Sequence, residues 1–92
     1  MSIFNEDDLK RKFLKFMKER FKVEGAYCRV YDWNKFIVNE FKKEEIELAT
    51  RFTQELINRK YLVVVNKNNE DFIAITGYGF KKIKSCTIEV DL

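Results

Sequence analysis

The 92-residue chain contains no histidine and no proline, and it has only three glycines. Without histidine there is no Ser-His-Asp or Cys-His nucleophile system and no imidazole ligand for a metal. The glycines form no loop of the kind that cradles phosphate groups. We therefore expect a protein that is not an enzyme, with no catalytic residues, no metal site and no cofactor.

Cysteine is also scarce, and the two residues, Cys28 and Cys86, lie far apart in the sequence. They form no Cys-x-x-Cys pair, so four-ligand zinc binding by one chain would need unusual partners. Both lie in apolar stretches, where a cysteine is most often a small buried hydrophobic residue. A disulfide between them, or across a dimer, is the less favoured alternative for an intracellular protein.

Long apolar runs are missing as well, since no stretch of about 18 apolar residues is present to cross a membrane. The amino-terminal residues show no basic-then-apolar signal segment. With 46% hydrophobic residues the chain can build one compact core, whereas two separate cores would each be too small. These features predict a single cytoplasmic domain over residues 1–92, without membrane association.

Charge of both signs is abundant, with 18 Lys and Arg against 15 Asp and Glu and a net charge of +3. This balance is only mildly basic, below what is typical of a dedicated nucleic-acid-binding protein. The cations are concentrated, however: residues 10–22 carry seven against one anion, and three more lysines lie within residues 81–84. Such a run is commonly a solvated helix face, and its function is open at this stage.

Residues 6–23 show the clearest helical pattern. Asn5 is a good N-cap, and the acidic residues after it suit the positive end of the helix dipole. Apolar residues recur at helical spacing on one face and cations occupy the other. The apolar residues are Leu9, Phe13, Phe16, Met17 and Phe21, with Leu14 at the edge. We predict that this stripe lies in the core and that Gly25 ends the helix.

Two short elements are expected next. Residues 26–31 are rich in strand-forming side chains and predict a brief strand. Asp32 is a plausible N-cap for a second helix over residues 33–41. Most of that helix is expected to be buried by its large apolar residues, namely Trp33, Phe36, Ile37 and Phe41.

A third helix is predicted over residues 44–60, with one apolar half and one exposed polar stripe. No glycine or proline separates it from the second helix, so one long helix is conceivable on local grounds. In a continuous helix, however, Trp33 would point to the same side as Arg51. A break near residues 42–44 lets both apolar faces meet one core, and we predict that break.

From residue 61 the pattern changes to β-branched runs, which predict a hairpin over residues 61–76. Asn68 and Asn69 tolerate positive φ and are expected at its tip. Two glycines then interrupt the strand pattern. Residues 86–91 alternate apolar and polar side chains, and this period of two predicts a final strand.

The order helix, short strand, helix, helix, hairpin resembles the winged helix-turn-helix domain. Residues 56–63 (LINRKYLV) resemble the end of a recognition helix entering the first wing strand. Residues 75–83 (ITGYGFKKI) are similar to the close of the wing in small prokaryotic and viral regulators. The resemblance implies an α+β fold of order helix-strand-helix-helix-strand-strand, with a further C-terminal strand as an option.

The chain departs from the winged-helix pattern at two places. The turn between the second and third helices often carries a glycine in that family, and this one has none. The segment after Gly79 often continues as a dimerising helix, whereas here it is short and is predicted to become a strand.

The resemblance implies sequence-specific binding of double-stranded DNA, by a small transcriptional regulator acting as a homodimer. The third helix would then enter the major groove and present exposed side chains to base edges. The expected base contacts are Thr50, Arg51, Gln54 and Asn58. The expected backbone contacts are Lys42 and Lys43 at the preceding turn and Lys67 in the wing.

The alternative function is a protein-interaction or assembly module that binds no DNA. The third helix opens with acidic residues, and Glu70 and Asp71 lie beside Lys67 in the wing. Near phosphates these carboxylates would be unfavourable, whereas they would suit a basic protein partner. Core packing accounts for the many aromatic residues, so no small-molecule ligand is expected.

Overall fold

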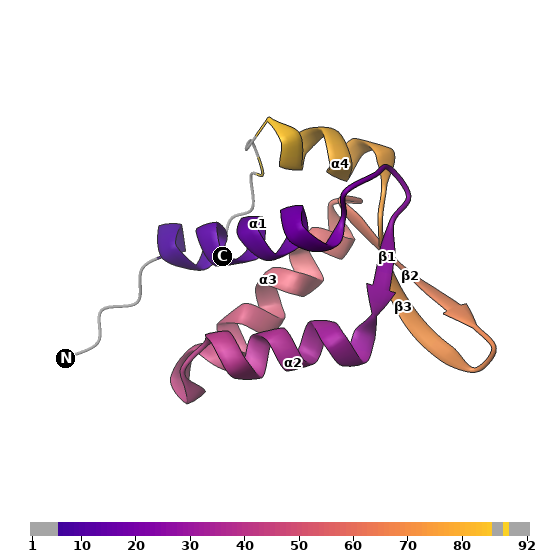
Figure 1. Cartoon of the computed structure of the whole chain (residues 1–92). Coiled ribbons are helices and arrows are strands. Elements are labelled where there is room, and N and C mark those ends of the chain that lie inside the picture. Colours follow the sequence, from indigo (N-terminus) through magenta and orange to yellow (C-terminus); the bar gives the residue numbers. More distant parts are fainter. Residues whose placement is uncertain (1–5, 86–87, 89–92) are drawn as a thin grey trace.

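The computed structural model describes residues 6–85 and Ile88 (Figure 1). Its elements are, in order, α1 (Glu6–Arg20), β1 (Tyr27–Arg29), α2 (Val30–Glu40), a 3-10 turn η1 (Lys43–Glu45), α3 (Ile46–Asn58), β2 (Leu62–Lys67), β3 (Glu70–Ile75) and α4 (Gly77–Lys84). Over the described residues this is an α+β fold with four α-helices and one antiparallel sheet in the order β1-β3-β2. The α+β class is confirmed, and the layout is compatible with a winged-helix-like arrangement.

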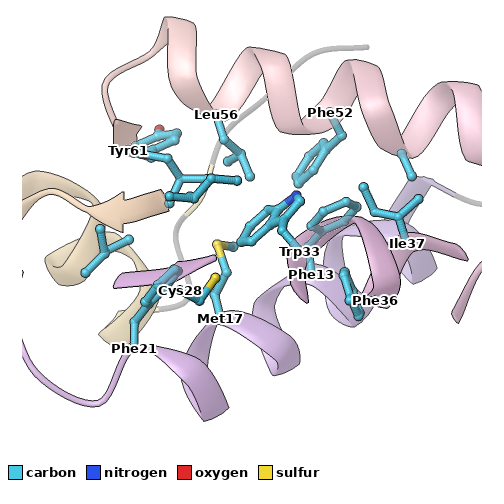
Figure 2. Packing of buried hydrophobic residues seen from close by; sticks show 14 of the residues in the cluster. Phe13, Met17, Phe21, Cys28, Trp33, Phe36, Ile37, Phe52, Leu56 and Tyr61 are labelled. Atoms are coloured by element: carbon cyan, nitrogen blue, oxygen red, sulfur yellow. The ribbon is translucent and has the colours of Figure 1, made fainter. Parts of the chain in front are cut away.

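The core is an aromatic cluster between the helices, with Phe13 at its centre (Figure 2). The ring centroid of Phe13 lies 4.7 Å from that of Phe52 on α3 and 5.8 Å from that of Trp33 on α2. Neither Phe13 nor Trp33 exposes any measurable surface. Four of the predicted α1 stripe residues are buried, namely Leu9, Phe13, Met17 and Phe21, and Phe16 is partly buried. The prediction that this stripe forms the core is confirmed.

The first two helices differ from the predicted boundaries. Helix α1 ends at Arg20, three residues early, and Gly25 lies in the following turn with a φ of +83°. Helix α2 begins at Val30, so Asp32 lies in its first turn and is not the N-cap that we expected. The Asp32 carboxylate instead accepts a hydrogen bond from Arg29 Nε at 3.2 Å, one residue before the helix. Asn5 lies outside the described residues.

The break between α2 and α3 is confirmed. Phe41 and Lys42 have extended backbone conformations, with ψ angles of 146° and 157°, between two helical segments. The Lys42 N–H donates to the Glu45 carboxylate at 2.9 Å, and the Glu45 N–H donates to the Lys42 carbonyl at 2.8 Å. This reciprocal pair satisfies backbone groups at the start of the next helix without a glycine.

The hairpin is confirmed, with β2 and β3 paired from Leu62↔Ile75 to Lys67↔Glu70. Asn68 and Asn69 form the tip with φ angles of +52° and +65°. Strand β1 pairs with β3 over three residues only, which makes it shorter than the predicted 26–31.

The segment after the hairpin is helix α4, and our expectation that it becomes a strand was wrong. Thr76 caps the helix by accepting a hydrogen bond from the Gly79 N–H at 2.9 Å. Ile83 is buried, and α4 lies beside α1 (Figure 1). The predicted strand over residues 86–91 and the cysteine Cys86 lie outside the described residues, apart from Ile88, which packs partly buried against the core and is not in a strand.

Candidate nucleic-acid interface

The exposed side of α3 carries the four residues for which base contacts are expected. Thr50, Arg51, Gln54 and Asn58 are all exposed, while Ala49, Phe52 and Leu56 are buried on the opposite side of the helix. The predicted division of the third helix into a polar and an apolar half is therefore confirmed. We call the four exposed residues the α3 stripe.

Local hydrogen bonds organise part of the α3 stripe. The Thr50 hydroxyl donates to the Ile46 carbonyl at 2.9 Å, so it is turned back toward its own helix. The Gln54 side-chain amide donates to the Asn58 side-chain carbonyl at 3.0 Å. The carbonyl oxygen of Gln54 and the amide N–H groups of Asn58 are then left as an acceptor and donors facing solvent. Two amides in this arrangement offer hydrogen-bond groups that are complementary to the donor and the acceptor that adenine presents in the major groove.

The orientation of α3, set by its buried apolar residues, is supported by a contact that sequence analysis missed. Trp33 Nε1 on α2 donates to the Thr53 hydroxyl at 2.9 Å, and this hydroxyl donates to the Ala49 carbonyl at 3.1 Å. We had treated Trp33 only as an apolar core residue. A buried indole N–H usually needs a polar partner, and Thr53 at the edge of the apolar half is the signal that could have indicated it. The bond keeps the α3 stripe directed away from the core.

The predicted backbone contacts lie at two separate places. Lys42 and Lys43 are exposed at the start of η1, directly before α3. Lys67 is exposed near the hairpin tip, where its ammonium lies 4.8 Å from the ring centroid of Tyr27. Lys67 is therefore held toward β1 in a cation–π contact. The tip also carries a hydrogen bond of 2.8 Å from the Asn66 amide to the Asp71 carboxylate.

Charge is distributed unevenly between this region and the rest of the molecule. Residues 42–75, which include η1, α3 and the hairpin, contain six cations and six anions. Residues 10–22 and 77–85, which form most of α1 and α4, contain ten cations and one anion. The region around the α3 stripe is thus without net charge, Arg51 is the one charged residue of the stripe itself, and the net positive charge of the protein lies elsewhere.

The remaining chemistry of the described residues gives no sign of a reactive centre. Cys28 is buried, and burial raises the pKa of its thiol from 9.0 to about 11, so the thiol stays protonated at neutral pH. The hydrogen bond to Asp32 raises the pKa of the Arg29 guanidinium above its usual value. Within residues 6–85 and Ile88, His, Cys, Asp and Glu form no group of three that could hold a metal ion. None of the helices in this part of the chain has the length and apolarity needed to cross a membrane.

Comparison with protein-family models, with curated proteins and with solved structures finds no match to this chain. The functional argument therefore depends on the site itself.

Proposed function

We propose that this chain is a winged-helix-like domain that binds double-stranded DNA in a sequence-specific manner, as a homodimeric transcriptional regulator. The observation that carries the proposal is the α3 stripe, the exposed polar face of a helix whose other face is buried. An extended break separates this helix from α2. A helix of this kind can enter the major groove, where amide and guanidinium groups can distinguish base pairs. The layout of three helices followed by a hairpin supports the same function.

In this proposal Arg51, Gln54 and Asn58 contact base edges, and Thr50 contacts a phosphate or a thymine methyl group. Lys42 and Lys43 contact the backbone beside the groove, and Lys67 contacts it from the hairpin. The neutral charge of this region implies that specificity comes from hydrogen bonds to bases, because few phosphates are neutralised here.

The test is selection of bound duplexes from a random pool, followed by fluorescence anisotropy on the selected site and on a scrambled duplex. The variant Arg51→Ala/Gln54→Ala should lose about 30-fold or more of the preference for the selected site, since each of the two base contacts is worth about 1–3 kcal/mol. A matched control is Lys35→Ala/Asn39→Ala, which removes one cation and one amide from the exposed surface of α2. This control should keep the preference.

The same selection tests the homodimer. Two-fold symmetric binding requires an inverted repeat whose half-sites are about one helical turn, roughly 34 Å, apart. A pool that yields no enriched sequence would contradict sequence-specific binding, and a single unrepeated half-site would contradict the homodimer.

Protein docking is the second candidate, favoured by the outer face of the sheet. Tyr27 is 54% exposed and Val63 is 44% exposed on this face, where Phe72 packs edge-on against Tyr27 with ring centroids 5.3 Å apart. The register pairs both Tyr27 and Val63 with Ala74, so they lie on one side of the sheet. An exposed aromatic surface of this kind is common at protein interfaces. Failure to bind any duplex at low salt would favour this second function.

A further inference from the structure

The basic surface on α1 and α4 is not used in the proposed function. On α1 the exposed cations follow the spacing four, three along one stripe, namely Arg11, Lys15 and Lys18, and Lys22 follows two residues after the end of the helix. At 1.5 Å per residue the helical part of this stripe, from Arg11 to Lys18, extends about 10 Å. Helix α4 packs beside α1 and adds two exposed lysines, Lys81 and Lys84. We call these six residues the α1–α4 basic surface.

Among the residues that the structure describes, few anions lie near this surface. Arg11 pairs with Asp8 at 3.6 Å, but both side chains are well exposed, so the pair is weak. Lys84 lies 5.3 Å from the ring centroid of Phe80, a contact that leaves its charge intact. Glu19 is the one acidic residue within residues 10–22. Cations such as Lys15, Lys22 and Lys81 therefore attract counterions from solvent, and a polyanion that binds to them gains free energy by releasing those counterions.

We infer that the α1–α4 basic surface binds the phosphate backbone of nucleic acid, independently of the α3 stripe. A row of cations about 10 Å long faces about six charges of a B-form duplex, which carries one charge per roughly 1.7 Å of axis. Regular spacing along a straight helix suits a linear polyanion of uniform charge. Contacts of this type carry no sequence information.

The composition of the surface favours nucleic acid over a protein or a membrane. Protein interfaces have an apolar centre and are depleted in lysine, whereas five of these six residues are lysine and the sixth is arginine, with no large apolar side chain between those on the stripe. A membrane-binding helix would insert its apolar face into the lipid. In α1 that face is already occupied, because Leu9, Phe13 and Met17 are buried in the core.

The cationic stripe of α1 and the α3 stripe lie on opposite sides of the core. Helices α1 and α3 meet through the rings of Phe13 and Phe52 (Figure 2). The exposed side of α1 and the exposed side of α3 therefore face away from each other. A single duplex segment lying on α3 would therefore not reach the α1 stripe. The inference goes beyond the proposed function in adding a second, non-specific contact surface.

The experiment measures binding of a mixed-sequence 30-base-pair duplex by fluorescence anisotropy between about 50 and 200 mM salt. The variant Lys15→Gln/Lys81→Gln removes one cation from each helix, and Lys35→Gln/Lys60→Gln is a control with the same change in net charge elsewhere. Since each phosphate contact contributes about 0.9 to the slope of log K against log salt, the first variant should lower the slope by about 1.8. The control should change it by less than one.

A quadruple variant that adds Lys22→Gln and Lys84→Gln should lower the slope by about 3.6. All four side chains are exposed, so the melting temperature should stay unchanged. Equal slopes for the basic-surface pair and the control pair would overturn the inference, because net charge alone would then explain the binding. If the quadruple variant lost binding to vesicles that contain anionic lipid but bound the duplex like the wild type, the inference would be overturned in favour of a membrane.

The variant Arg51→Ala/Gln54→Ala separates this inference from the proposed function. If only the proposed function is wrong, that variant changes nothing while the lysine variants still lower the slope. If only the present inference is wrong, the lysine variants keep the wild-type slope while Arg51→Ala/Gln54→Ala loses the preference for the selected site.

Discussion

The two outward-facing helix surfaces of this protein share one core and differ in nearly everything else. The α3 stripe carries a single charge, that of Arg51, beside amide and hydroxyl groups, and the bond between Trp33 and Thr53 helps to hold α3 in place. The α1–α4 basic surface is dominated by long cationic side chains, and its main organising feature is the packing of α4 against α1. The difference indicates that a preorganised polar surface suits recognition of particular partners, whereas a flexible cationic surface suits attraction of any polyanion.

The largest expected effect is one that removes both surfaces together. Phe13 contacts the rings of Trp33, Phe36, Phe41 and Phe52, and so joins α1 to α2 and α3. Phe13→Ala should lower the free energy of unfolding by about 3–5 kcal/mol, because it leaves a cavity in a fully buried position. Urea denaturation followed by Trp33 fluorescence measures this loss.

The adjacent position Phe16 offers a matched control for Phe13→Ala. Phe16 is on the same helix but only partly buried, so Phe16→Ala should cost clearly less. Equal losses for the two variants would contradict the view that Phe13 is the central contact of the core.

The next effect also acts on both surfaces, because it changes the stability of the whole fold with pH. The pKa of Cys28 is about 11 in the folded protein, above its usual 9.0, so the folded state holds the thiol proton more tightly than the unfolded chain. This preference stabilises the fold fully below about pH 9 and is lost as the pH rises through about 11. Its full size is about 3 kcal/mol, at roughly 1.4 kcal/mol per pKa unit.

The measurement for Cys28 is urea denaturation of wild type and Cys28→Ala between pH 7 and pH 11, with a reductant present. Other groups titrate in this range, but they are shared by both proteins and cancel in the difference. The stability difference between the two should narrow above pH 9. A constant difference across the whole range would show that the buried thiol does not titrate as expected.

The smallest expected effect disturbs one of the two surfaces and leaves the other intact. A Cβ atom added at Gly79 would overlap the backbone carbonyl oxygen of Tyr61, which cannot move away easily. Gly79→Ala should therefore displace α4 from the end of α3 and cost about 1–3 kcal/mol as an overpacked contact. It should weaken non-specific duplex binding at the α1–α4 basic surface and leave the α3 stripe intact.

Gly77→Ala is the natural control for Gly79→Ala, because its added Cβ meets only the flexible carboxylate end of Glu24. That carboxylate can turn toward solvent, so we expect little change in thermal melting. If Gly77→Ala were as destabilising as Gly79→Ala, loss of glycine from α4 rather than the close approach to Tyr61 would be the cause.

Local rules predicted much of the fold because they act over a few residues. The helical stripe of α1, the break at residues 42–44 and the hairpin tip at Asn68 and Asn69 all follow from spacing and backbone preference. The exposure of the α3 stripe was predictable for the same reason, since an apolar half on one side leaves a polar half on the other.

Helix α4 could not be predicted in this way. Two of its eight residues are glycine, which disfavours a helix interior by about 1 kcal/mol each, so the segment looks like an interrupted strand. Its helical form depends on contacts with residues that are distant in the sequence, which only the fold brings together. The Thr76 hydroxyl donates to the carbonyl of Lys60 at 2.6 Å, and Ile83 is buried.

By itself the sequence determined the chemical character of each helix face, because that character depends only on which residues recur at helical spacing. It also determined where the chain must turn. Only the tertiary structure decided that α4 exists, that it packs beside α1, and that α1 and α3 meet across the core. These relations depend on contacts such as Phe13 with Phe52, between residues far apart in the chain, whose pairing no local pattern specifies.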